Sequence, residues 1–231
     1  MTMDAAISRE EVFINEFVAK VFGWMAFALT VTGITAFLVS QSMDTVRMIV
    51  LNRPVFFGLM LVELGLVMMI SWLINKISFT TAIVLFMTYS VVNGLTLSVI
   101  FLAYTMASIA STFLVTASTF GVMCAYGLVT KRDLTGIGSL LYMALFGLII
   151  ASIANFFLHN ELVYWIITYA GVIIFVGLTA YDTQKIKRIG ETSFAKTEKG
   201  QNLAVIGALS LYLDFINLFL FLLRLLGNRR R

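Results

Sequence analysis

The chain has 231 residues, of which 60% are hydrophobic and only 12% are charged. A soluble domain usually has about 25% charged residues, so this composition indicates a polytopic membrane protein. The single cysteine, Cys124, excludes an intrachain disulfide, and the single histidine, His159, argues against histidine-based catalysis or metal binding. The net charge of +4 is interpreted as a signal of membrane orientation, and no nucleic-acid partner is expected.

A helix that crosses a bilayer needs about 20 mostly apolar residues. Residues 1–20 are polar and mixed in charge, and we expect them to form a cytoplasmic segment ahead of a transmembrane domain over 21–228. Seven segments in that domain are long and apolar enough: 21–41, 55–75, 80–104, 106–130, 134–157, 162–182 and 203–226. The sequence therefore predicts an all-α integral membrane protein with seven transmembrane helices.

Lysine and arginine residues in the short loops predict the orientation. With seven spans, the N-terminus and the second, fourth and sixth loops share one side of the membrane. This side carries most of the basic residues: Arg9, Lys20, Lys76, Lys131, Arg132, and Lys185, Lys187, Arg188, Lys196 and Lys199 of the last loop. We therefore expect the N-terminus in the cytoplasm, although the three arginines at the C-terminus oppose this orientation.

The last predicted span carries a polar stripe. Its members are spaced by three or four residues, which places them on one helical face: Gly207, Ser210, Asp214, Asn217, Phe221 and Arg224. A charged side chain within the bilayer is costly and is expected to be functional or paired. At 1.5 Å per residue, Asp214 and Arg224 lie about 15 Å apart along the helix axis, so each needs a separate partner.

Two other carboxylates lie within predicted spans and are the candidate partners. In the predicted topology Glu63 shares the outer half of the membrane with Arg224, which predicts an ion pair whose simplest role is structural. Asp182, at the end of the sixth predicted span, lies near Asp214 on the inner side. Two adjacent carboxylates cannot both ionise cheaply at low dielectric, so they can share a proton near neutral pH or attract a cation. The open alternative is that Asp182 caps its helix and Asp214 bonds to neighbours on its own helix, Asn217 or Ser210.

Four stretches resemble a known family. "TAYDTQKIKR" (179–188) and "LSLYLDFINLFLFLLRLLG" (209–227) are similar to the last two helices of the Bax inhibitor-1 family, also called the transmembrane Bax inhibitor motif family. "YGLVTKRDLTGIGSLLYMALFGLIIASIANFF" (126–157) and "VFGWMAFALTVTGI" (21–34) resemble its bacterial branch. The resemblance covers residues 15–228 and implies a multi-pass protein of the bacterial inner membrane, with six helices surrounding a central C-terminal helix.

The resemblance also implies a function, that of a pH-sensitive calcium leak channel gated by two aspartates that share a proton. These aspartates correspond to Asp182 and Asp214, which would form the pH sensor and a weak calcium site on the cation pathway. Ser210 and Asn217, on the polar stripe, would support them. In such a channel calcium is the ion that passes through, and no tightly bound cofactor is expected.

The family's outer pair of an acid and an arginine corresponds to Glu63 and Arg224. Some relatives also carry an arginine at the cytoplasmic end of the second helix, which latches onto the aspartates. The corresponding position in this chain is Ile74, which cannot act as this latch, and Lys76 is the candidate that replaces it by reaching toward Asp182.

An enzyme is not expected. The stretch "GIGS" (136–139) has no histidine nearby, and the aspartates lack the "GxGD" context of an intramembrane aspartate protease. The alternative function is a non-transporting regulator that binds and modulates other membrane proteins, such as a membrane protease. The expected partners are therefore the lipid bilayer, calcium and protons, with other membrane proteins under the alternative.

Overall fold

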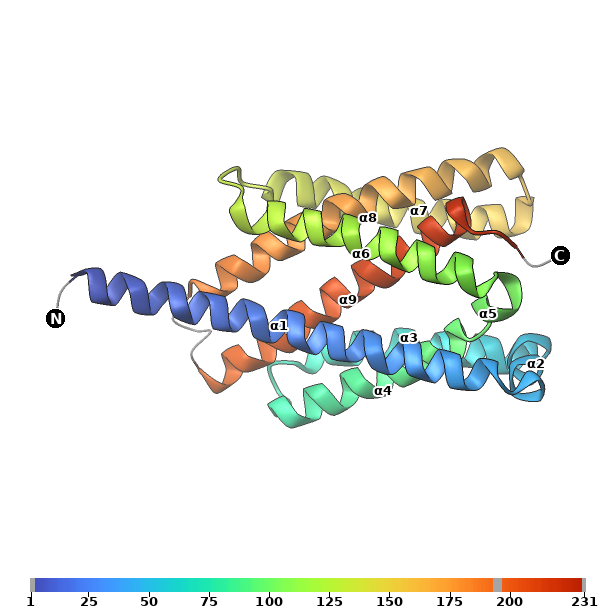
Figure 1. Ribbon diagram of the computed structural model, residues 1–231, viewed down its shortest axis with the longest axis horizontal. Coiled ribbons are helices and arrows are strands. Elements are labelled where there is room, and N and C mark those ends of the chain that lie inside the picture. Colours follow the sequence, from blue (N-terminus) through green and yellow to red (C-terminus); the bar gives the residue numbers. More distant parts are fainter. Residues whose placement is uncertain (1–2, 193–196, 230–231) are drawn as a thin grey trace. The chain divides into compact units, whose positions relative to one another are not determined.

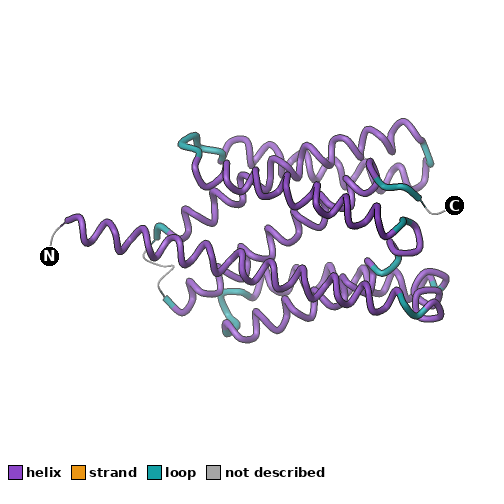
Figure 2. Tube along the Cα trace, in the orientation of Figure 1, coloured by secondary structure: helices purple, strands orange, loops and turns teal. Residues whose placement is uncertain are grey.

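The computed structural model describes residues 3–192 and 197–229, and the described chain is helical apart from short loops (Figures 1 and 2). The helices are α1 (Met3–Ser40), α2 (Met43–Leu51), α3 (Arg53–Leu73), α4 (Phe79–Leu97), α5 (Ile100–Ala103), α6 (Met106–Val129), α7 (Thr135–Leu158), α8 (Glu161–Gly190) and α9 (Glu198–Leu226). Lys196 of the basic loop and the terminal Arg230 and Arg231 lie outside the described residues.

Seven helical stretches are long and apolar enough to cross a membrane, which confirms the prediction of an all-α membrane protein. They are Val12–Ser40, Arg53–Leu73, Phe79–Ala103, Met106–Val129, Thr135–Leu158, Glu161–Gly190 and Gly200–Leu226. The last of these is the most buried, with 67% of its apolar window inside the protein against 39% or less for each of the others. Such burial is what a central helix requires, and the ring of six helices around it stays a prediction.

Several helix boundaries differ from those predicted. The chain is helical from Met3 onward, because the polar segment that precedes the first span has no glycine or proline and is rich in helix formers. The helix α8 continues past the expected end at 182 as far as Gly190, since the sequence "TQKIKRI" contains no helix breaker. Asp182 is therefore an interior residue of a helix, and it does not cap the end of one.

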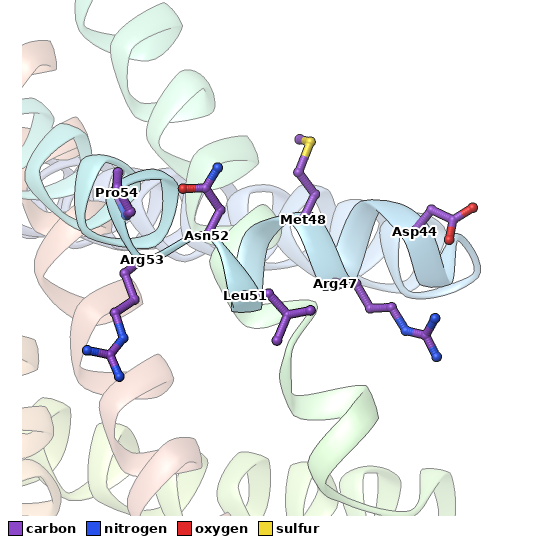
Figure 3. A pocket seen from close by; sticks show the side chains of 7 residues that line it. All are labelled: Asp44, Arg47, Met48, Leu51, Asn52, Arg53 and Pro54. Atoms are coloured by element: carbon purple, nitrogen blue, oxygen red, sulfur yellow. The ribbon is translucent and has the colours of Figure 1, made fainter.

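A short helix that the sequence reasoning missed lies in the first loop. Ser42 caps α2 by accepting a hydrogen bond from the backbone N–H of Thr45. A pocket of about 680 Å³ borders α2 and the start of α3, and in Figure 3 the side chains of Arg47 and Arg53 extend to the same side of the helix, with Leu51 between them. This helix exposes both basic and apolar side chains, as expected of a helix at a membrane surface.

The described chain divides into two compact units. The first unit comprises residues 3–105, 186–192, 197–212 and 229, and the second comprises residues 106–185 and 213–228. Both α8 and α9 contribute residues to each unit.

The first unit is built around the contacts of α4 with α1 and α3. Gly94 permits the closest approach, because a Cβ atom at this position would lie 2.7 Å from the Cβ of Thr35 and 2.8 Å from the carbonyl oxygen of Thr32. Without this glycine, α4 could not approach α1 so closely, and the two helices would have to separate.

The second unit contains α6, α7, most of α8 and the C-terminal part of α9. Its core is apolar and consists of Leu148, Ile167, Ile174, Phe175, Leu178, Leu218 and Leu222. Two glycines allow helices to approach α8 closely. A Cβ atom at Gly127 of α6 would overlap the carbonyl oxygen of Ala180, and one at Gly138 of α7 would overlap the ring of Tyr181. Both contacts fall on the turn of α8 that immediately precedes Asp182.

We predict that Gly127→Ala destabilises the protein by about 1–3 kcal/mol, because the new methyl group meets a backbone carbonyl that cannot rotate away. Gly121→Ala is the matched control on the same helix, since a Cβ atom there meets nothing within 4 Å. The control should be neutral or slightly stabilising, because alanine favours helix more than glycine does. Thermal unfolding in detergent measures both, and equal melting temperatures for the two variants would contradict the close contact of α6 with α8.

Candidate functional site

The two aspartates predicted to form the site both belong to the second unit. Asp182 on α8 is 3% exposed and Asp214 on α9 is 5% exposed. Each lies within electrostatic range of the hydroxyl of Tyr142 on α7, and Asp214 lies within range of Asp182 itself. Three helices of one unit thus place two buried carboxylates and a tyrosine hydroxyl in one neighbourhood.

Tyr142 is a member of this site that the sequence reasoning missed. Its hydroxyl donates to the carboxylate of Asp182, at 3.1 Å from Oδ1 and 3.2 Å from Oδ2. The ring of Tyr142 packs edge-to-face on Tyr181, with centroids 6.0 Å apart, and this contact holds the hydroxyl in place. A tyrosine within an apolar helix gives no sequence signal by itself, because most such rings simply pack against neighbours.

Asp214 has a different environment from Asp182. Its Oδ2 atom is buried and has no hydrogen-bond partner among the described residues. Asn217, expected to support it, donates instead to the carbonyl oxygen of Leu213 on its own helix at 2.8 Å. Ser210, the other supporting residue, belongs to the first unit. A buried carboxylate oxygen without a donor is costly, which is why such an atom marks a place for a proton or a cation.

The site as described offers few ligands for a metal ion. Among the described residues, no group of three or more His, Cys, Asp or Glu side chains lies close enough together to hold one. Calcium usually takes six to eight oxygen ligands, so two carboxylates would bind it only weakly.

Gln184, two residues after Asp182, fixes the loop between α6 and α7 to α8. Its Nε2 donates to the carbonyl oxygen of Arg132 at 2.7 Å, and its Oε1 accepts from the backbone N–H of Leu134 at 2.9 Å. The side chain thereby pairs one backbone acceptor and one backbone donor of that loop. Together with the close contacts at Gly127 and Gly138, these two hydrogen bonds set the position of the α8 turn that carries Asp182.

Glu63 lies in the first unit, where it accepts hydrogen bonds from two residues of α4. Thr96 Oγ1 donates to Oε1 at 2.5 Å, and Asn93 Nδ2 donates to Oε2 at 3.4 Å. The carboxylate of α3 is thus joined to α4 by neutral donors, a feature that the sequence reasoning did not predict.

Tyr212 of α9 extends this network. Its hydroxyl donates to Asn93 Oδ1 at 3.2 Å and lies 2.7 Å from Thr32 Oγ1 of α1. The rings of Phe86 and Tyr89 pack edge-to-face against it, each with a centroid distance of 5.6 Å. Four helices of the first unit, α1, α3, α4 and α9, are therefore connected by one chain of buried hydrogen bonds.

Arg224 and Lys76 complete the predicted set. Arg224, in the second unit, lies over the rings of Tyr164 and Phe221 at 5.1 and 5.3 Å, as a guanidinium commonly does. Lys76, in the first unit, is exposed in the turn between α3 and α4. The pairing of Arg224 with Glu63 and that of Lys76 with Asp182 each join the two units and stay predictions.

A second side-chain amide, that of Asn202, stabilises the turn that contains Lys76 through two hydrogen bonds. Asn202, near the start of α9, donates to the carbonyl oxygens of Ile74 and Ile77, both at 2.9 Å. Its position in the sequence, between a basic loop and an apolar span, gave no indication of this role. The partners lie more than a hundred residues away in the chain, and only the fold brings them together.

The fold and these buried polar groups define the chain as a multi-pass α-helical membrane protein with carboxylates inside its helical bundle. The family model described as inhibitor of apoptosis-promoting Bax1 matches residues 14–231. The chain belongs to this family, the Bax inhibitor-1 family, as the sequence resemblance predicted.

Bacterial relatives match over nearly their whole length. The inner membrane protein YbhL of Escherichia coli strain K12 is 50% identical over 218 residues, which cover 94% of this chain and 93% of the relative. A protein of Borreliella burgdorferi is 45% identical over 229 residues and 99% of both chains. The protein RP147 of Rickettsia prowazekii is 40% identical over 217 residues, 94% of this chain and 91% of its own.

We predict that Tyr212→Phe costs about 1–3 kcal/mol of stability, because it leaves the buried Asn93 Oδ1 without its donor. Tyr89→Phe is the matched control, since this buried tyrosine also packs on the same cluster but its hydroxyl has no hydrogen bond among the described residues. Thermal unfolding of both variants in detergent measures the difference, and an equal loss of stability would contradict the network.

The predicted pair of Glu63 and Arg224 is tested by a double-mutant cycle. Glu63→Gln should destabilise the protein if it leaves the arginine without an anionic partner, and adding Arg224→Leu should recover part of that loss. Melting temperatures of the wild type, the two single variants and the double variant give the coupling. Strict additivity of the two single effects would show that these residues are not partners.

Proposed function

We propose that the protein is a pH-sensitive calcium leak channel, gated by Asp182 and Asp214. One observation carries the proposal. Two almost fully buried carboxylates lie within electrostatic range of each other on α8 and α9, and Asp214 Oδ2 has no hydrogen-bond partner among the described residues. Family membership supports the same assignment, because the two aspartates are the ones that the resemblance singles out.

In the proposed mechanism a proton closes the pathway. At low pH one proton shared by the carboxylates supplies the missing hydrogen bond and holds α8 and α9 together. As the pH rises the proton leaves and two like charges remain in a setting of low dielectric, where they repel strongly. The contact then opens or admits a cation, so calcium flux increases with pH.

The ligands at the site suit a passing ion better than a bound one. The two carboxylates supply four oxygen atoms, and the single O–H of Tyr142 already donates to the carboxylate of Asp182. Calcium prefers six to eight oxygens, so water must complete its shell and the affinity should be low. Weak binding allows an ion to leave as well as to enter, as conduction requires.

The proposed location is the inner membrane of a bacterial cell, with the N-terminus in the cytoplasm. The name of the Escherichia coli relative, an inner membrane protein, supports this membrane. The basic residues of the last loop support the orientation. Calcium, protons and lipid are the proposed partners.

We predict that Asp182→Asn and Asp214→Asn each abolish the pH dependence of calcium flux, because an amide keeps the shape of the carboxyl group but does not titrate. Wild-type flux should rise with pH across the neutral range. Calcium entry into liposomes that contain only the purified protein, followed with a trapped calcium dye, is the measurement. Asp44→Asn is the control, since this aspartate is exposed on α2, and its profile should match the wild type.

Two results would contradict the proposal in different ways. A wild-type pH profile in both aspartate variants would place the sensor elsewhere in the protein. The absence of calcium flux through the wild type at every pH would favour the alternative, a regulator that acts by binding other membrane proteins.

A further inference from the structure

The second unit has a pocket at the turn between α7 and α8, beside the C-terminal end of α9. It has a volume of about 480 Å³, and the residues that matter for its chemistry are Asn155, His159, Asn160, Glu161, Tyr164 and Arg224. The turn joins two membrane-spanning helices, which end at Leu158 and begin at Glu161. The pocket therefore lies at the membrane surface. It borders the first residues of α8, whereas Asp182 lies near the other end of that helix.

Two asparagines line this pocket, Asn155 half-buried and Asn160 exposed. The Oδ1 atom of Asn155 accepts from the backbone N–H of Asn160 at 3.0 Å, and Oδ1 of Asn160 accepts from the backbone N–H of Val163 at 3.1 Å. A backbone N–H can only donate, so both amide oxygens are fixed and both NH₂ groups point elsewhere. Neither NH₂ group has a hydrogen-bond partner among the described residues.

Arg224 contributes the positive charge. The rings of Tyr164 and Phe221 hold its guanidinium in place, and within the second unit it forms no ion pair with a described residue. Glu161, which is exposed at the first residue of α8, is the only carboxylate among the lining residues. The pocket thus combines one cation and two oriented amide donors with a single acidic side chain at its border.

These groups suit a phosphate. A guanidinium matches phosphate geometry with two parallel donors, and the start of a helix such as α8 adds a favourable dipole for an anion. The pocket is much larger than a bare phosphate ion needs, and its remaining wall is apolar, with Phe156, Ile167 and Phe221. An acyl chain could follow that wall into the bilayer.

We infer that this pocket binds the phosphate group of an anionic phospholipid, with Arg224, Asn155 and Asn160 as the donors. The inference is independent of the proposed calcium leak, because none of these residues touches the aspartates. It is also compatible with the predicted pairing of Arg224 with Glu63, since a guanidinium has five N–H donors and can contact two anions.

The test measures the binding of short-chain lipids to the purified protein in a neutral detergent, followed by thermal unfolding at increasing lipid concentration. Dioctanoyl phosphatidylglycerol should stabilise the wild type more than dioctanoylglycerol, which has the same acyl chains but no phosphate. Arg224→Gln should weaken the binding of phosphatidylglycerol about tenfold or more, the usual effect of losing a charge-assisted hydrogen bond.

Two further variants make the test specific. Asn160→Asp keeps the oxygen that caps α8 but replaces the NH₂ donor with an anionic oxygen, so it should fold and bind at least as weakly as Arg224→Gln. If Arg224→Gln does not fold, the affinity of Asn160→Asp for phosphatidylglycerol alone tests the inference. Arg53→Gln is the matched control, because it removes an exposed arginine of the pocket beside α2 (Figure 3) that is not among the residues lining the pocket tested, and its binding should equal that of the wild type.

The remaining outcomes are also decisive. Inorganic phosphate that stabilises the wild type as strongly as phosphatidylglycerol, with the same dependence on Arg224 and Asn160, would overturn the lipid as the occupant, and a weaker effect would support it. Equal binding of the two lipids would overturn the inference. So would wild-type affinity in both pocket variants, or an equal loss in Arg53→Gln.

Discussion

The absence of water from the hydrocarbon core of a membrane is the constraint on which this structure depends, because every polar group inside it needs a partner within the protein. The network around Glu63 meets this requirement with neutral donors from α4 and, through Tyr212, with α9 and α1. The aspartates of the second unit meet it only in part. Asp182 accepts from the hydroxyl of Tyr142, whereas one oxygen of Asp214 has no hydrogen-bond partner in the part of the chain that the structure describes. This contrast explains why the aspartates, and not Glu63, are the stronger candidates for a titrating site.

Close packing places those partners where they are needed. Small residues allow helices to approach without a hydrophobic force between them, and here Gly127 and Gly138 bring α6 and α7 against the turn of α8 before Asp182. Gln184 then fastens the loop between α6 and α7 to the same helix. The turn of α8 that carries the aspartate is thus held by contacts with two neighbouring helices and with the loop between them.

The last helix carries polar groups on two sides. Tyr212 and Asp214 are two residues apart, which places them about 200° apart around the helix axis at 3.6 residues per turn. Tyr212 completes the network of the first unit, and Asp214 belongs to the second. A single amphipathic stripe therefore describes α9 incompletely, because the tyrosine on its opposite side also forms buried hydrogen bonds.

The sequence by itself determined the class of protein, the seven spans, the family and the identity of the buried acids, because hydrophobic length and charge inside an apolar run are local properties of a chain. Tertiary structure alone decided the partners. Tyr142, Gln184 and Asn202 are ordinary residues in the sequence, and each acts through a contact with a residue 40 or more positions away. The interior position of Asp182 in α8 and the local hydrogen bond of Asn217 also followed from the folded helices. A buried hydrogen bond is a property of two groups and the distance between them, and the sequence specifies the groups but not that distance.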